Sequence, residues 1–378
     1  MDLTAIQLQL PFFPNGGGGE GIPWWTYLIW ILPMFFFILY GQKFQMWMVL
    51  NDVSKSVNKL KGMREKARTE AIEYAKTINP NTDPTEKIDH FLEYFTIMPV
   101  DIDPSGIMKK LQHLVRVRDD RVKAEVRAMA PSMDNLTASK MENILEAATI
   151  LHLIYKVVRH FYLMGKKTAS MFFLVQLQMI MPILLQEAEA LNKAVGTFKA
   201  GQPIGDGIGA MIVGKMMLKK DKKTIARETL VSEDQYNGRT IYLMKAEGPA
   251  GNVGEPGTAV EKMINEMGVK INSIIMIDAA LKLEGEKTGE LAEGVGAAIG
   301  GIGVDRFQIE EVATRHGIPV YAIIIKQSII DAITVMKKEI AESIEKVSKS
   351  VFNVIEEKTK EGDNVLIIGV GNTLGVGQ

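Results

Sequence analysis

Glycine-rich loops with acidic neighbours are the segments of this sequence best suited to chemistry. Three of them each follow an apolar run: KAEGPAGNVGEPG at Lys245–Gly257, the segment after Asp278, and the tail GVGNTLGVGQ at 369–378. Backbone amides in such loops can approach a phosphate or carbonyl oxygen closely, and a carboxyl group can transfer a proton. The loops therefore contain the first candidate site residues, which are Asp278, Gly251, Asn252, Gly371 and Asn372.

A sheet covered by helices is expected to position these loops. From Gly201 onward, short β-branched runs alternate with helical segments, as in domains with a parallel sheet. The predicted strands are Thr240–Ala246, Ile271–Ile277, Val320–Ile325 and Val365–Val370, and the predicted helices are Gly207–Lys220, Gly257–Met267, Asp305–His316 and Ser328–Lys360. Ligands of open parallel sheets bind outside the carboxyl ends of the strands, so the three loops should meet at one edge.

The tail alone is a weak sign of nucleotide binding. No helix follows GVGNTLGVG in the sequence, whereas a dinucleotide motif opens a helix, and glycines also serve ordinary turns. The histidines receive no site role: His152 and His160 lie two turns apart on one helical segment, and His316 precedes a strand, at the edge opposite the site.

The tail carries more information when it is joined to the segment that begins at Gly201. GVGNTLGVGQ followed by GQPIGDGIGAMIV resembles the opening of the hydrogenase-maturation endopeptidases and of the germination proteases of bacterial spores. IIMIDAALKLE resembles the strand that carries their second acidic residue, and GVGAAIGG followed by HGIPVYAIII resembles a later loop and strand of the spore proteases. The resemblance covers roughly the last half of the chain in circularly permuted order, which is compatible with termini that lie close together.

This resemblance implies a peptidase-like site with two catalytic acids, Asp206 and Asp278, and a peptide substrate. It also places Gly205 and Gly207 beside the tail, as further ligand-binding residues. Two facing carboxylates could share a proton, activate water or hold a divalent cation. The histidine of the metal-assisted maturation proteases has no match here, so the metal stays open. The alternative interpretation makes Asp206 a turn residue or N-cap and Asp278 a turn former at a strand end.

An apolar segment near the N-terminus predicts a membrane anchor. No charged residue occurs between Glu20 and Lys43, and aromatic residues gather at both ends of that segment. Lysines and arginines are absent before the segment and frequent after it, which predicts a cytoplasmic C-terminal bulk. The expected organisation is an external tail at 1–21, a transmembrane helix at 22–42, a helical cytoplasmic domain at 43–200 and an α/β domain at 201–378. We expect a single-pass protein of the cell membrane.

Apolar residues recur at helical spacing between Phe44 and Ala200, with loops at the prolines. Met171–Leu185 is the most apolar stretch of this region, but at about 15 residues it is short for a membrane span. We interpret it as a core helix or a subunit interface, with contact to the membrane as the alternative. The interface interpretation predicts a homo-oligomer.

Composition excludes several classes of function. The net charge is −1 with 44 basic and 45 acidic residues, so nothing favours nucleic acid as a partner. The chain has no cysteine, which excludes disulfides, thiolate metal sites and thiol nucleophiles. Over its full length the sequence resembles an archaeal membrane-anchored family of unknown function. Two hypotheses follow: a membrane-tethered hydrolase that uses Asp206 and Asp278, and a non-catalytic homo-oligomeric scaffold.

Overall fold

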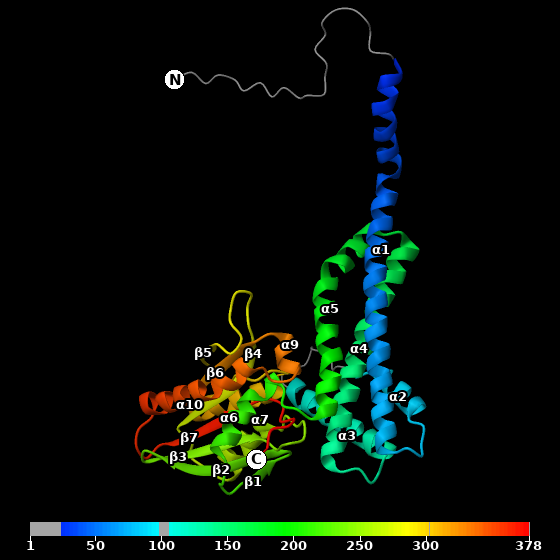
Figure 1. Ribbon diagram of the computed structural model, residues 1–378. Coiled ribbons are helices and arrows are strands. Elements are labelled where there is room, and N and C mark those ends of the chain that lie inside the picture. The colour runs from blue at the N-terminus through cyan, green and yellow to red at the C-terminus, as the bar shows by residue number, and fades with distance from the viewer. Residues whose placement is uncertain (1–23, 98–105, 302, 378) are drawn as a thin grey trace, which may run out of the picture.

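A computed structural model describes residues 24–97, 106–301 and 303–377 of the chain (Figure 1). These residues form ten α-helices and one seven-stranded sheet. The first half is helical and comprises α1 (Trp24–Ile78), α2 (Thr85–Leu92), α3 (Ile107–Met129), α4 (Asn135–Thr168) and α5 (Met171–Ala200). The predicted external tail lies outside the described residues, as do the first two residues of the predicted transmembrane helix.

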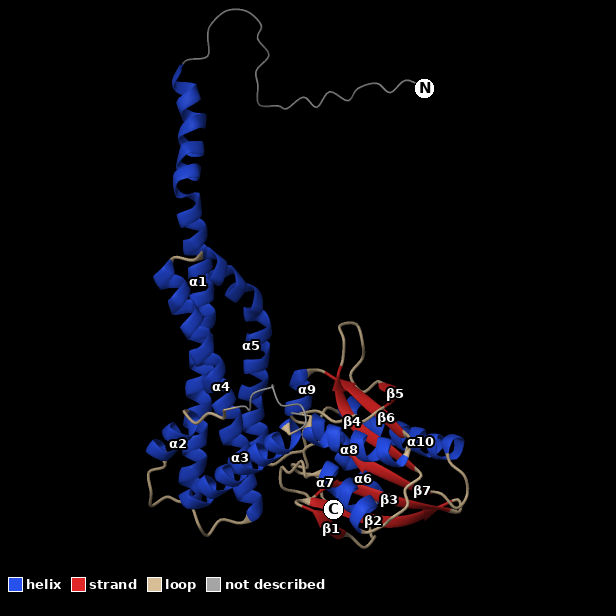
Figure 2. Cartoon of the chain, turned by 180° about the vertical axis from the view of Figure 1, so that it is seen from behind, coloured by secondary structure: helices blue, strands red, loops and turns tan. Residues whose placement is uncertain are grey.

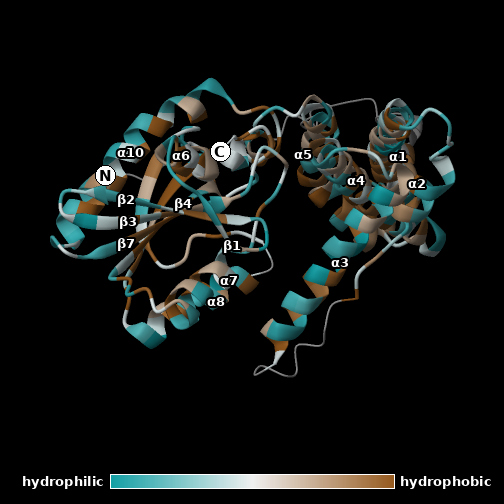
Figure 3. Ribbon diagram, turned by 90° about the horizontal axis from the view of Figure 1, so that it is seen from below, coloured by the Kyte–Doolittle hydropathy of each residue, from teal (hydrophilic) through white to brown (hydrophobic). Residues whose placement is uncertain are grey.

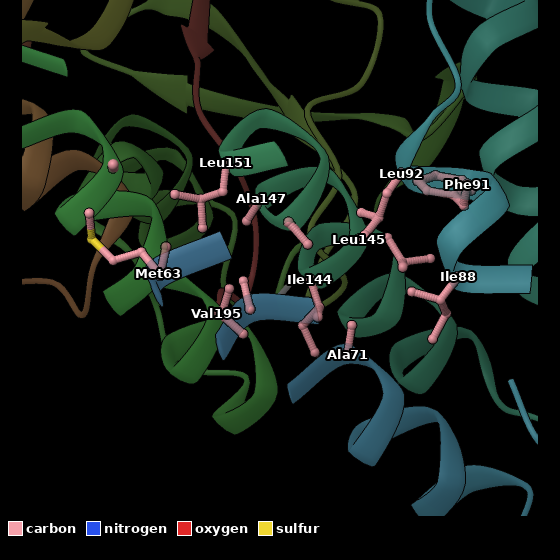
Figure 4. Close-up of a cluster of buried hydrophobic side chains, with 14 of the residues drawn as sticks. Met63, Ala71, Ile88, Phe91, Leu92, Ile144, Leu145, Ala147, Leu151 and Val195 are labelled. Atoms are coloured by element: carbon pink, nitrogen blue, oxygen red, sulfur yellow. The ribbon is translucent and has the colours of Figure 1, made fainter. Parts of the chain in front are cut away.

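The helical domain has a core of its own. Apolar residues from the lower part of α1 and from α2, α4 and α5 pack into one cluster, part of which Figure 4 shows around Ile144 and Leu145. α4 begins at an N-cap, since Asp134 accepts a hydrogen bond from the amide of Thr137. The loop predicted at 99–105, one of those expected at the prolines, lies outside the described residues.

The first half of α1 projects from this core without a neighbour (Figures 1 and 2). Its large apolar side chains are exposed from Ile29 onward, with Phe37 at 75%. Soluble proteins rarely expose so much contiguous apolar surface. Within the described part of the chain, α5 is the one helix that is long and apolar enough to cross a membrane, by length and composition.

The predicted strands form the centre of the sheet. β3 (Arg239–Ala246), β7 (Asn364–Gly369), β4 (Ser273–Leu281) and β6 (Val320–Gln327) are adjacent and parallel in that order. Three further strands make the sheet mixed rather than mainly parallel: β1 (Lys223–Ala226) and β2 (Thr229–Tyr236) extend one side, and β5 (Leu291–Val295) the other. All three pair antiparallel with their neighbours.

A turn signal for the missed hairpin is present in the sequence. β2 and β3 are joined at Asn237 and Gly238, and both residues have positive φ angles, 44° and 72°. Asn-Gly between two β-branched runs is a strong short-range indication of a hairpin. The charged residues of β2 conceal the hairpin in the sequence. They occur because β2 lies near the edge of the sheet and its second half is exposed or partly exposed.

Helices cover both faces of the sheet (Figure 3). One face carries α6 (Ile208–Met216) and α10 (Lys338–Lys358), and the other carries α7 (Pro256–Glu261), a π-helical turn (Lys262–Glu266) and α8 (Val304–His316). The prediction of a single helix over Ser328–Lys360 is wrong. This segment contains two helices, α9 (Ile329–Ile333) and α10. They are separate because the chain is extended at Thr334 and Val335 forms a β-bridge with Ile204.

The helical domain packs against the loops at the carboxyl edge of the sheet. Arg116 of α3 holds Glu255 with two hydrogen bonds of 2.8 and 2.5 Å, and the hydroxyl of Ser139 on α4 accepts from the amide of Gly251 at 2.8 Å. Leu374 of the tail is fully buried within the core cluster of the helical domain. The edge where ligands of such sheets bind is therefore covered by helices.

Candidate functional site

Asp206 lies in a short 3₁₀ turn, Gly205–Gly207, immediately before α6. Its Oδ2 accepts a hydrogen bond of 2.9 Å from the amide of Asn372, the third residue after β7. Burial raises the pKa of this carboxyl, and the hydrogen bond from Asn372 opposes the rise. The turn and the tail, which are 166 residues apart in sequence, are thus in direct contact.

Asp278 lies within β4, where its register partner is Ile324 of β6, and is only 6% exposed. Its Oδ1 accepts from the amide of Ala279 at 2.7 Å, and the amide of Gly300 in the glycine-rich loop before α8 donates to the same carboxyl group. Burial, followed by the charge of Asp206, raises the pKa of Asp278 to about 8. The two carboxyl groups are therefore close enough to interact, and Asp278 is protonated at neutral pH when Asp206 is ionised.

Glycines allow the turn, α6 and the tail to come together. A Cβ atom on Gly207 would overlap the carbonyl oxygen of Asn372, and one on Gly371 would overlap that of Asp206. Gly371 also has φ +124°, a conformation that other residues rarely adopt. Gly205 packs in the same way against the backbone of Asp331. The three glycines, which were predicted to bind a ligand, thus pack against the protein's own backbone.

Thr373 ties the loop at 247–255 to the tail. Its buried hydroxyl lies within hydrogen-bond distance of the carbonyl oxygens of Glu247, Ala250 and Asn252, at 2.8, 2.6 and 3.1 Å. The side-chain amide of Asn372 donates to the carbonyl of Gly251 at 3.2 Å. The two glycine-rich segments that the sequence placed at one edge are joined by these bonds.

A cleft of about 150 Å³ separates this edge from the helical domain. Three predicted ligand-binding residues, Gly251, Asn252 and Asn372, line it from the sheet side. The opposite wall comes from α3 and α4 and was not foreseen from the sequence; it consists of Arg118, Asp119, Val122, Lys123, Glu142, Asn143 and Glu146. Asp206 and Asp278 are not among the residues that line this cleft, but Asn372 lines it and also holds Asp206.

The cleft wall carries acidic side chains that are partly shielded from water. Burial raises the pKa of Asp119, Glu142 and Glu146, while Arg118 partly offsets the effect on Glu146 from 2.9 Å. Lys123 forms an ion pair with Glu228 across the cleft. No sequence pattern indicated this wall, because polar residues on a helix ordinarily face solvent.

The donors at the two aspartates do not fit a resident divalent cation. Mg²⁺ and Ca²⁺ take six or more oxygen ligands, and metal ligands must be deprotonated. Here two carboxyl groups supply the side-chain oxygens, and each already accepts a backbone hydrogen bond. Across the described residues, no group of three or more histidine, aspartate or glutamate side chains could hold a metal ion.

Lys245 is a buried titratable residue that the sequence interpretation did not select. It is 1% exposed, its Nζ donates to the carbonyl of Ala246 at 2.9 Å, and burial lowers its pKa to about 8. Lys245 and Ile277 are both in register with Gly369, so they share the sheet face covered by α6. Asp278 follows Ile277 and points to the opposite face, so Lys245 does not join the carboxyl pair.

These features define a two-domain α/β protein in which a helical domain covers the carboxyl edge of a mixed sheet, with a buried pair of aspartates at that edge. The chain belongs to the DUF1512 family, a family of unknown function. Its N-terminal domain model matches residues 27–201, and its C-terminal domain model matches residues 204–377. Comparisons with curated proteins and with solved structures gave no match. The archaeal origin and the likeness to proteases remain predictions.

Proposed function

We propose that this chain is a hydrolase of the peptidase type that uses Asp206 and Asp278 as a proton-sharing pair. The observation that carries the proposal is the effect of Asp206 on Asp278 at the carboxyl edge of the sheet, where the charge of Asp206 helps to raise the pKa of Asp278. With one proton between them, the ionised carboxylate can take a proton from water as the water oxygen attacks the substrate carbonyl. The protonated carboxyl can then donate its proton to the departing amide nitrogen.

The ends of the α/β domain support the permuted relationship to proteases on which this assignment draws. A Cβ atom on Gly375 of the tail would touch Pro203 and the carbonyl oxygen of Gly201. The last residues of the chain thus lie against the residues that begin the domain, which is the arrangement a circular permutation requires. Asn372 connects the pair to the cleft, which provides the route for a peptide substrate.

Hydrolysis of a peptide library by the purified full-length protein tests the proposal. Asp206→Asn and Asp278→Asn should each reduce cleavage by at least about 100-fold, the usual contribution of a general acid or base. Asp305→Asn is the matched control: Asp305 is also a carboxyl group with a pKa raised by burial, and its Oδ1 accepts from the amide of Gly257 at 2.8 Å. Equal losses in all three variants, or activity retained without Asp206, would contradict the role of the pair.

We also propose that α1 anchors the protein in a membrane, with the N-terminus outside and the two domains in the cytoplasm. The free apolar half of α1 and the lysines that follow it support this topology. A protease added outside intact cells should then remove residues before about Ile22 and leave the rest protected. Mass spectrometry of the protected fragment measures this, and cleavage beyond Phe44 would reverse the orientation.

A homo-oligomeric scaffold is the second candidate function. Leu174, Leu177 and Met181 of α5 are buried in the helical core, in agreement with the core interpretation of Met171–Leu185. Met179, Ile180 and Ile183 remain exposed on the same helix and would suit contact with a second copy. A solubilised particle that contains one chain would remove this candidate.

A further inference from the structure

The turn between α4 and α5 carries exposed aromatic and basic side chains beside α1. Phe172 and Phe173 begin α5 with their rings 5.8 Å apart, and Phe172 is 67% exposed. Lys166 and Lys167 end α4, are exposed, and form no ion pair within the described part of the chain. We refer to residues 166–173 as the α4–α5 tip.

Two side-chain contacts set the level of α5 along α1. Gln178 donates to Asp52 at 2.7 Å, and Lys59 pairs with Glu189 at 2.5 Å. Higher residue numbers on α1 thus meet higher numbers on α5, so the two helices run in the same direction. Each rises by about 1.5 Å per residue, which places Met171 beside about Gln45.

The tip therefore lies just beyond the apolar half of α1. Figure 1 shows the turn next to α1, directly below the part of that helix that stands free. Lys43, Phe44 and Trp47 of α1 are at the same level, and the rings of Phe44 and Trp47 stack at 5.9 Å. Basic and aromatic side chains from three helices thus gather at one height, as they do at membrane–water interfaces.

The position of α5 along α1 also decides whether the apolar surface of α5 crosses the membrane or only reaches the membrane–water interface. α5 is apolar enough to cross a membrane, but it runs beside Asp52 and Lys59, the charged part of α1. It cannot share the bilayer core with the apolar part of α1, because that part lies wholly on the other side of Lys43. Only the first turn of α5 reaches the interface.

We propose that the α4–α5 tip is a second membrane contact, which inserts Phe172 and Phe173 among anionic lipid headgroups while Lys166 and Lys167 bind them. The inference rests on the proposed anchoring of α1 and goes beyond it. Aromatic rings favour the headgroup level, and juxtamembrane lysines are attracted to anionic lipid. A second contact beside α1 would limit the tilt and rotation of the helical domain relative to the membrane more than α1 alone does.

Because the chain has no cysteine, single cysteine variants can report membrane depth directly. We suggest Phe172→Cys in the tip, Phe36→Cys in the apolar half of α1, and Phe307→Cys, an exposed site on α8, as the matched control. Each full-length variant is labelled with a fluorophore and reconstituted into vesicles of phosphatidylcholine and phosphatidylglycerol. Nitroxide lipids then quench the label at two depths.

The label at Phe172 should lose emission to nitroxides near the headgroups, the label at Phe36 to nitroxides deep in the acyl chains, and the label at Phe307 to neither. If Phe36 is quenched and Phe172 behaves like Phe307, the tip proposal is wrong while the anchor stands. If Phe36 is also unquenched, the anchor fails as well.

Two further experiments test whether the tip binds anionic lipid or another partner. In vesicles of phosphatidylcholine alone the quenching at Phe172 should fall, and Lys166→Gln with Lys167→Gln should remove the difference between the two lipid compositions. A difference that survives this double replacement would overturn the role of the lysines. Self-quenching between labelled copies at Phe172, without any effect of nitroxide lipid, would assign the tip to a dimer interface instead.

Discussion

Replacement of Asp278 by asparagine is expected to stabilise the protein at about pH 8 while it abolishes hydrolysis. The folded state keeps Asp278 protonated until its pKa of about 8, whereas an unfolded aspartate ionises near its ordinary value of 3.8. The stability that this proton contributes is therefore complete below about pH 4 and is lost as the pH rises toward about 8. The difference between the two pKa values corresponds to on the order of 5 kcal/mol.

Asparagine has nearly the shape of a protonated aspartic acid and no proton to lose. Its side-chain oxygen can still accept from the amide of Ala279. We expect the unfolding midpoint of the Asp278→Asn variant to change little between about pH 5 and about pH 8, where that of the wild type should fall. Thermal unfolding followed by circular dichroism at several pH values measures both curves.

Asp206→Asn provides a second check on the same pair. This replacement removes the charge that helps to raise the pKa of Asp278. The loss of stability with rising pH should therefore end at a lower pH in this variant than in the wild type. Asp305→Asn should leave that part of the curve in place, because Asp305 does not contribute to the pKa of Asp278. A wild-type midpoint that rises between about pH 5 and about pH 8 would refute the assignment of the proton.

Gly209→Ala is expected to cost about 1–3 kcal/mol of folding free energy or more, as overpacking of a close contact does. A Cβ atom at this position of α6 would overlap the carbonyl oxygens of Ile277, in the middle of β4, and of Val370, directly after β7. Neither oxygen can rotate away, so α6 must shift. Because Asp206 directly precedes α6, the shift should also disturb the carboxyl pair.

Gly196→Ala is the matched control. Gly196 lies inside α5 with nothing within 4 Å of the added Cβ atom, so this change should raise stability by about 0.5–1 kcal/mol through helix propensity. Denaturant unfolding of the two variants under one condition gives the comparison. If Gly209→Ala proves as harmless as Gly196→Ala, α6 does not lie as close to the backbone of Ile277 and Val370 as the structure places it.

Much of the fold was predictable because the signals are local. The runs YLMKA, IIMID, AIII and VLIIG are apolar enough to be buried on both faces, and all four became the parallel centre of the sheet. The strands that escaped prediction, β1, β2 and β5, lie at or next to the edges, where polar residues face solvent and the apolar pattern is interrupted. Their antiparallel pairing turned an expected mainly parallel sheet into a mixed one.

The candidate site was only partly predictable, because its parts are distant in sequence. Asp206 could be placed near the tail only through the resemblance to permuted proteases, and its hydrogen bond to Asn372 depends on a pairing across 166 residues. The cleft wall on α3 and α4 could not be predicted from the sequence, since its charged residues have the pattern of an ordinary solvated helix face.

The sequence by itself determined the central strands, most of the helices, the apolar start of α1 and the glycine-rich loops, because these depend on residues within a few positions of one another. Only the tertiary structure decided that Asp206 and Asp278 share one environment, that the helical domain closes the carboxyl edge, and that the α4–α5 tip lies level with Lys43. Each of these depends on how two distant segments pack: burial sets the pKa values of the aspartates, and the contact of Gln178 with Asp52 sets the height of the tip.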